Sequence, residues 1–192
     1  MIITISGTPG SGKSTLAKLL AEKLKAQRIY VGGIRRELAE KKGMTLEELN
    51  KYALTHPETD VDVDKSAAKQ ARALVKKHPI VIVEGRTQFH FIPESIKLFV
   101  TVDPKEAARR IWKSMKDDPS RKNEGKAKTL RDVEKLIDER ERNDDQRYRK
   151  YYKLDYRNLG HYNLVVDTTH LSVDQTLQTV LKFLKKGALL PK

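Results

Sequence analysis

Residues 7–14 read Gly7-Thr8-Pro9-Gly10-Ser11-Gly12-Lys13-Ser14. This spacing, G-x-x-x-x-G-K-[ST], is typical of a loop whose backbone N–H groups surround the phosphates of a nucleoside triphosphate. In such a loop Lys13 reaches the β and γ phosphates, the Ser14 hydroxyl is offered to Mg²⁺, and glycines let the backbone approach closely. An apolar run at residues 2–5 precedes the loop, and an amphipathic run at residues 16–24 follows it. We therefore predict a nucleotide-binding loop between a strand and a helix N-terminus.

The composition narrows the class of protein. The 192 residues suit one domain, and the absence of cysteine excludes disulfides, thiolate metal sites and cysteine nucleophiles. The apolar runs are too short to cross a membrane and we see no secretory leader, so we expect a cytoplasmic protein with no membrane partner. The net charge of +13 and a pI near 9.8 indicate a polyanionic partner, either nucleotide phosphates or nucleic acid. Lysine and arginine are spread along the chain without a zinc-finger, KH or RRM motif, so nucleic-acid binding is the alternative.

Short β-like runs alternate with helical runs along the chain. The expected strands lie at residues 2–6, 28–31, 80–83, 98–102 and 164–166. The expected helices lie at residues 13–26, 34–77, 130–152 and 173–185, with a further helix from residue 104. This alternation predicts an α/β protein with a central, mainly parallel sheet covered on both faces. The order of the strands in the sheet does not follow from it.

Two segments do not fit the simple alternation. Residues 33–77 contain no strand, and their helical pattern is interrupted by Gly43 and by the turn-like sequence at residues 56–58. Residues 113–128 hold six basic and three acidic residues and little to bury, so we expect them to be mobile, and we expect the tail at residues 187–192 to be a frayed end. Both internal segments are candidates for handling a second substrate.

The long helix expected at residues 130–152 has an apolar face that becomes charged. Thr129 and Asp132 form an N-cap pattern at its start. Its apolar face is made of Val133, Leu136 and Ile137, and steps of three and four residues continue that face to Arg140, Asp144, Arg147 and Tyr151. Two arginines around a carboxylate suit a phosphate together with a hydroxyl or base edge of one bound molecule. The alternative is a solvated helix in which these charges pair with Glu139, Glu141 and Asp145.

Charged residues also follow two of the expected strands. Glu84 and Arg86 follow the buried run at residues 80–83, and Arg36 lies just past the strand expected at residues 28–31. Ligands of open α/β sheets bind beyond the carboxyl ends of the strands. We expect Glu84 to hold a water on Mg²⁺, and Arg86 and Arg36 to reach an acceptor phosphate. Arg35 points elsewhere on a helix, so only one of the two adjacent arginines should face the ligand.

Taken together, these motifs resemble those of the nucleoside monophosphate kinases, and specifically the archaeal-type cytidylate kinases. The resemblance covers nearly the whole chain. Besides the phosphate loop it rests on the runs at residues 32–39, 42–48, 57–60, 84–86, 140–141, 147–148 and 166–169, with Asp64 and Asp144. It implies a three-layer P-loop NTPase fold with a helical monophosphate-binding insertion and a lid. The implied core is residues 1–32, 78–112 and 153–186, the insertion residues 33–77, and the lid residues 113–150.

The resemblance also implies roles for individual residues. The ATP site would comprise Gly7, Thr8, Pro9, Gly10, Ser11, Gly12, Lys13, Ser14 and Thr15. The residues implied in catalysis are Lys13, Arg110, Arg140 and Arg147. Those implied in binding the monophosphate are Arg36, Asp60, Arg86, Arg140, Asp144 and Arg147. Mg²⁺ would be held by Ser14 and, through water, by Glu84.

The implied reaction is phosphorylation of CMP or dCMP by ATP, an in-line transfer in which positioning and cations supply the catalysis and lid closure excludes water. The chain departs from the family pattern at Gly33, at residues 66–67 and at residues 87–90, and the last two departures lie near the expected base pocket. The base is therefore open between cytosine, uracil and adenine. The alternatives are a kinase of another monophosphate or of a small metabolite, or a basic, nucleotide-dependent nucleic-acid-binding protein. We expect a monomer.

Overall fold

The computed structural model describes residues 1–117 and 127–187. The strands are β1 (Ile2–Gly7), β2 (Gln27–Tyr30), β3 (Val81–Glu84), β4 (Ile96–Thr101) and β5 (Leu164–Asp167). The helices are α1 (Lys13–Leu24), α2 (Val31–Lys41), α3 (Leu46–Tyr52), α4 (Glu58–Leu74), α5 (Gln88–Phe91), α6 (Pro104–Asp117), α7 (Leu130–Tyr152), η2 (Leu159–His161) and α8 (Val173–Lys186). All strand pairs are parallel, in the order β2-β3-β1-β4-β5. The predicted α/β fold with a parallel central sheet is confirmed.

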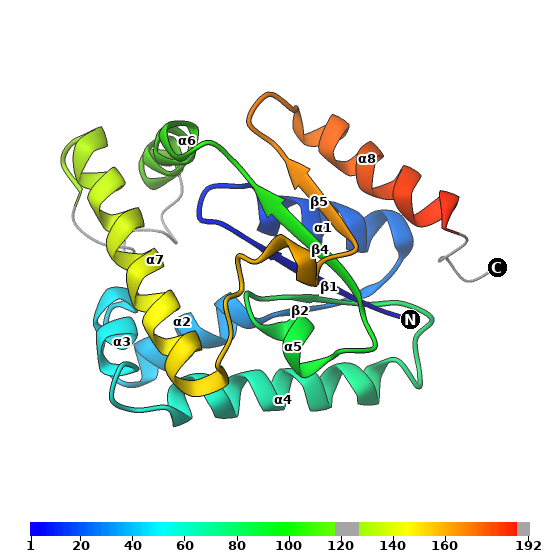
Figure 1. The fold of residues 1–192 in the computed structure, drawn as a ribbon, viewed down its shortest axis with the longest axis horizontal. Coiled ribbons are helices and arrows are strands. Elements are labelled where there is room, and N and C mark those ends of the chain that lie inside the picture. Colours follow the sequence, from blue (N-terminus) through cyan, green and yellow to red (C-terminus); the bar gives the residue numbers. More distant parts are fainter. Residues whose placement is uncertain (118–126, 188–192) are drawn as a thin grey trace.

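The central strand β1 shows why the sheet is covered on both faces. Ile3 and Ile5 pack with apolar residues of α1 and α8 in one core cluster, whereas Ile2 packs on the opposite face with residues of α4 (Figure 1). Thr4 and Ser6 share that second face and are buried, so their hydroxyls need partners. The Thr4 Oγ1 atom lies 2.9 Å from Ser95 Oγ. Ser6 Oγ donates to the Arg86 carbonyl at 3.0 Å, which fixes the turn after β3.

Four helices stand around the carboxyl ends of the strands. Figure 1 shows α2 and α3 at the same end of the sheet as α6 and α7. α6 and α7 pack through their own apolar cluster, which includes Ala108, Val133 and Ile137. The predicted N-cap at Thr129 is confirmed, because Thr129 and Asp132 form a reciprocal capping box at the start of α7. These helices leave a space between them above the phosphate loop.

Some predicted boundaries change. The helices expected through residues 34–77 are α2, α3 and α4, and the predicted interruptions are confirmed: Gly43, at φ +66°, lies between α2 and α3, and residues 53–57 separate α3 from α4. The single turn of helix α5 was not predicted. The segment expected to be mobile begins inside α6, which extends to Asp117, and that part of the expectation is wrong. Residues 118–126 and the tail at residues 188–192 lie outside the described residues.

Candidate active site

The phosphate loop closes tightly between β1 and α1. Gly10 and Gly12 have φ values of +73° and +80°, a conformation that favours glycine. A Cβ atom at Gly10 would also lie 2.7 Å from Ala107 Cα, so α6 packs directly against the loop. Ser11 Oγ donates to the Thr8 carbonyl at 2.8 Å, and the Ser11 carbonyl accepts from Thr168 Oγ1 at 3.0 Å. The loop is thus held from both sides at the positive end of α1, where an anion is stabilised.

Glu84 is a buried carboxylate that pairs with the nearby cationic side chains. Its Oε1 atom lies 2.9 Å from Lys13 Nζ and accepts a hydrogen bond from Ser14 Oγ. Its Oε2 atom accepts from Arg28 Nη2 at 2.5 Å and Nε at 3.2 Å. Burial opposes ionisation of Glu84, but these partners outweigh it and hold the pKa of the carboxyl below its usual value. Burial lowers the pKa of Lys13.

The residues of the charged stripe on α7 form a buried ion-pair network, so the predicted inward orientation is confirmed. Asp144 pairs through one oxygen with Arg86, at 2.9 Å, and through the other with Arg147. Arg147 also lies 3.1 Å from Asp60 of α4, and Asp60 in turn pairs with Arg35 of α2. The nearby cations hold the pKa of Asp144 low despite its burial. The network ties together the turn after β3 and three helices.

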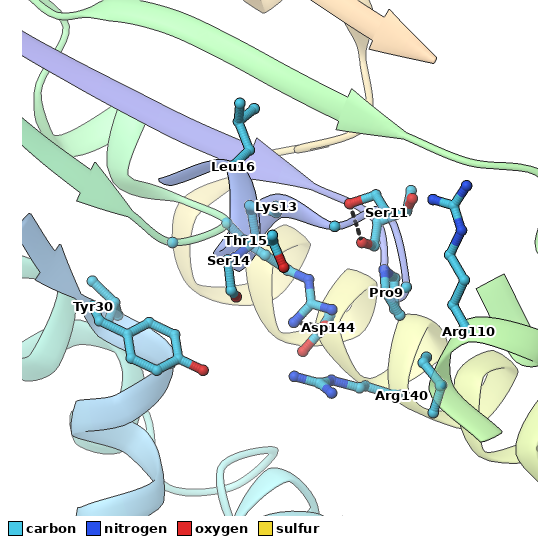
Figure 2. A pocket seen from close by; sticks show the side chains of 18 of the residues that line it. Pro9, Ser11, Lys13, Ser14, Thr15, Leu16, Tyr30, Arg110, Arg140 and Asp144 are labelled. Atoms are coloured by element: carbon cyan, nitrogen blue, oxygen red, sulfur yellow. Dashed lines mark hydrogen bonds and ion pairs between the residues drawn. The ribbon is translucent and has the colours of Figure 1, made fainter. Parts of the chain in front are cut away.

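Arg110 of α6 lies on the other side of the loop. It donates to the Thr168 carbonyl at 2.7 Å and to Thr168 Oγ1 at 3.0 Å, and it pairs with Glu106 at 3.0 Å. Thr168 is the residue that also holds the Ser11 carbonyl. In the view of Figure 2, Lys13 and Ser14 lie between Tyr30 on one side and Arg110 and Arg140 on the other.

A cavity of about 490 Å³ joins these groups. Of the predicted site residues, its walls contain Thr8, Pro9, Gly10, Ser11, Gly12, Lys13, Ser14, Thr15, Arg36, Asp60, Arg86, Arg110, Arg140 and Asp144. Three predicted residues are not among the lining residues. Gly7 lies beneath the loop, where a Cβ atom would overlap the Val100 carbonyl, and Glu84 lies behind Lys13 and Ser14. Arg147 is 1% exposed and lies behind Asp144, a placement that favours holding Asp60 and Asp144 over touching a substrate.

Several lining residues were missed by sequence reasoning. The expectation that only one of Arg35 and Arg36 faces the cavity is wrong, because both line it. Asp64 lies in the wall and accepts from Thr87 Oγ1 at 2.7 Å, Gln88 Nε2 at 2.8 Å and Tyr152 OH at 2.9 Å. Burial raises the pKa of Asp64 to about 6. Its only signal in the sequence was its place in the motif around residues 57–64. The remaining missed lining residues that bear on the site are Tyr30, Asn50, Thr87 and Tyr148.

Ser14 and Glu84 are the residues of this site that could hold Mg²⁺. Oxygen ligands are what Mg²⁺ takes, and it is usually bound through one or two protein oxygens together with substrate phosphates and waters. The Ser14 hydroxyl and the Glu84 carboxylate stand together beside the loop and fit this mode. Within residues 1–117 and 127–187, no group of three or more His, Cys, Asp or Glu side chains is arranged to hold a metal by itself. The residues therefore fit an ion that arrives with a nucleotide. Within the same residues, no helix is both long and apolar enough to span a membrane.

A triphosphate loop and a second set of buried and half-buried arginines face one cavity at the carboxyl edge of a parallel sheet. The fold and this site together define a P-loop phosphotransferase. Comparison with solved structures agrees on the fold: shikimate kinase from Acinetobacter baumannii, in complex with shikimate, matches with a TM-score of 0.56, covering 97% of this chain and 93% of that chain. The two are 15% identical, so the likeness concerns the fold.

Comparison of sequences is more specific. A family model described as an AAA domain matches residues 3–132. Cytidylate kinase of Archaeoglobus fulgidus is 36% identical over 183 residues, covering 95% of this chain and 93% of the relative. Cytidylate kinase of Methanopyrus kandleri is 35% identical over 185 residues, covering 95% and 91%. The chain belongs to the cytidylate kinase family.

Proposed function

We propose that this protein transfers the γ-phosphoryl group of ATP to CMP or dCMP, giving ADP and CDP or dCDP. The observation that carries the proposal is the shared cavity, in which the loop residues Lys13 and Ser14 face the arginines Arg36, Arg86 and Arg140. A phosphate donor and a phosphate acceptor both need cations, and they need them within reach of each other. The relatives named cytidylate kinase supply the identity of the acceptor base.

In the proposed reaction an oxygen of the CMP phosphate forms the new bond to the γ phosphorus of ATP. The bond between that phosphorus and the bridging β,γ oxygen breaks, and the electron pair leaves with ADP. Ser14 and, through water, Glu84 would hold Mg²⁺, which would supply positive charge to the phosphates when it is bound. Lys13 stabilises the charge on the transferring group and Ser14, with Glu84 behind it, orients toward the metal. Arg110 contacts the ATP phosphates beside the loop.

The acceptor is held by the opposite wall. Arg36, Arg86 and Arg140 bind its phosphate, and the buried Nε of Arg86 has no hydrogen-bond partner among the described residues, which leaves a donor available to that phosphate. Asp144 and Asp60 bind the sugar and base side. Arg147 neutralises both carboxylates and fixes their positions, so we assign it a positioning role in place of the expected catalytic one. We further propose that the enzyme is monomeric and acts in the cytoplasm.

A coupled assay of ADP release over CMP, dCMP, UMP, AMP, GMP and shikimate tests the proposal. We expect turnover with CMP or dCMP to exceed that with every other acceptor, and to require Mg²⁺. If another monophosphate is the only one turned over, that monophosphate would replace CMP as the proposed acceptor. Turnover with shikimate only, or salt-sensitive nucleic-acid binding with no acceptor at all, would reject the proposal.

A further inference from the structure

Tyr30 is a wall residue of the cavity to which neither the sequence motifs nor the proposed function gives a role. It ends β2, where it pairs with Glu84 at the end of β3, and α2 begins at the next residue. Its side chain is half-buried and projects into the pocket near Lys13 and Ser14 (Figure 2). The position is therefore at the junction of the donor and acceptor walls.

The Tyr30 hydroxyl holds Arg36. It accepts a hydrogen bond from Arg36 Nη1, and the Arg36 guanidinium carbon lies 5.6 Å from the centre of the phenol ring. The same Nη1 lies 3.4 Å from the Gly32 carbonyl, one turn earlier in α2. An arginine side chain has many rotamers, and fixing one of them costs conformational entropy. A hydroxyl that holds the guanidinium before the substrate arrives removes part of that cost from binding.

The two glycines that follow provide the space for this ring. A Cβ atom at Gly32 would lie 2.9 Å from Tyr30 Cε2, and one at Gly33 would lie 2.7 Å from Tyr30 Cδ1. Neither glycine has a positive φ, so backbone conformation does not require them. Glycine is a poorer helix former than alanine, and here it stands twice in the first turn of α2. The space that the Tyr30 ring needs explains why both Gly32 and Gly33 are glycines.

The ring is also held on the side of the donor site. The guanidinium carbon of Arg28 lies 4.9 Å from its centre, and Arg28 donates twice to Glu84 Oε2. The other oxygen of Glu84 contacts Lys13 and Ser14. One chain of contacts thus runs from the phosphate loop through Glu84, Arg28 and Tyr30 to Arg36.

We propose that Tyr30 is a positioning residue that aims Arg36 at the phosphate of the acceptor, and that Gly32 and Gly33 are present to seat its ring. The inference rests on the proposed function. A hydrogen bond to a charged group that orders the acceptor site should change acceptor binding about tenfold. It should leave ATP binding unchanged, because the proposed function places Arg36 at the acceptor phosphate.

The first test is Tyr30→Phe, which removes the hydroxyl and keeps the ring. We expect the KM for CMP to rise about tenfold, with the KM for ATP and the Tm nearly unchanged. Binding of cytidine, which lacks the phosphate, should also stay unchanged in calorimetry. Tyr162→Phe is the matched control, since its hydroxyl donates to the Tyr156 carbonyl and does not line the cavity. Gly33→Ala should weaken CMP binding as Tyr30→Phe does, because its Cβ atom displaces the ring.

A double-mutant cycle with Arg36→Met separates positioning from direct contact. If Tyr30 acts through Arg36, Tyr30→Phe has no further effect on the KM for CMP in the Arg36→Met background. An equal effect in both backgrounds would overturn the inference, because the hydroxyl would then act on the substrate itself. An unchanged KM for CMP in Tyr30→Phe alone would overturn it as well. If the wild-type protein turns over CMP and Tyr30→Phe has the same KM for CMP, only this inference is rejected. If the wild-type protein is inactive on CMP, the proposed function is rejected.

Discussion

The donor half and the acceptor half of the cavity are built in different ways. The donor half is one continuous loop, residues 8–15, fixed by glycine conformations and by short-range hydrogen bonds such as that from Ser11 to Thr8. The acceptor half takes its charged residues from α2, α4, α7 and the turn after β3. Asp60 and Arg147, which are paired there, are 87 residues apart in sequence.

Because the two halves are built differently, substitutions in them should differ in how much they change catalysis and how much they change the free energy of unfolding. The loop side chains that face the cavity share one carboxylate, Glu84, which has several other donors, so a substitution there should cost more in activity than in folding. In the acceptor half the charges that face the substrate are paired with charges that hold helices together. Removing one partner of a buried ion pair leaves the other uncompensated, which is costly. A substitution in the acceptor half should therefore weaken both substrate binding and folding. The loss of stability should be larger the more buried the substituted side chain is.

The largest effect on catalysis is expected at Lys13. Lys13→Ala removes the cation at the transferring phosphoryl group, so kcat should fall about 10⁴-fold. The free energy of unfolding should fall by less than for an isolated buried pair, because Glu84 loses Lys13 but keeps Ser14 and Arg28. Steady-state kinetics and urea unfolding measure the two effects. Lys18→Ala, an exposed lysine on the same helix, is the control and should be unaffected. Comparable activity in the two variants would break the assignment of the donor half.

The next largest effect is expected at Arg140. Arg140→Ala should lower kcat/KM for CMP about 10³-fold while ATP binding stays nearly unchanged, because the proposed function assigns Arg140 to the acceptor phosphate. Kinetics with each substrate varied, together with calorimetric titration of ATP, test this. Arg142→Ala provides a control two residues further along α7, where the side chain is exposed. Equal losses of ATP and CMP binding would contradict the division into two halves.

Arg147→Met tests the structural side of the comparison. It leaves Asp60 and Asp144 buried without their shared cation, and breaking such a pair costs about 3 kcal/mol of unfolding free energy. Denaturant unfolding gives the value, and exposed Arg149→Ala is the reference. A variant as stable as wild type would show that Arg147 contributes to the substrate site alone.

The smallest effect concerns pH and Asp64. Burial raises the pKa of Asp64 to about 6 from an ordinary value of 3.8, so the folded protein binds this proton more tightly than the unfolded chain. Stability is then lost as the pH rises through that interval, by about 2 kcal/mol between pH 4.5 and 7. Asp64→Asn should lack this slope, whatever its absolute stability. Parallel slopes in the two proteins, measured by unfolding at several pH values, would contradict the assignment.

What could be predicted from the sequence follows the same division. The loop and the start of the helix after it were predicted correctly because their residues are neighbours in the chain. The inward face of α7 was predicted because helical periodicity continues from Val133 to Arg147 whatever the partners are. The fold class followed from the alternation of strands and helices.

The rest depends on which strands are neighbours. Arg28 reaches Glu84 because β2 pairs with β3, and the sequence does not show that pairing. Arg147 was expected to touch the substrate, which stays a prediction; its pairing with Asp60 on α4 was not expected. Arg35 was expected to point away, yet its helix starts so close to the cavity that Arg35 and Arg36 both reach the wall. Ion pairs between distant segments decide these cases.

The most direct measurement follows the label from ATP marked in its γ phosphate when the wild-type protein, Mg²⁺ and CMP are mixed. We expect the label to appear in CDP at the same rate as ADP forms. Label found only as inorganic phosphate, or ADP formation unaffected by CMP, would show that the two halves of the cavity do not act on two nucleotides in one transfer.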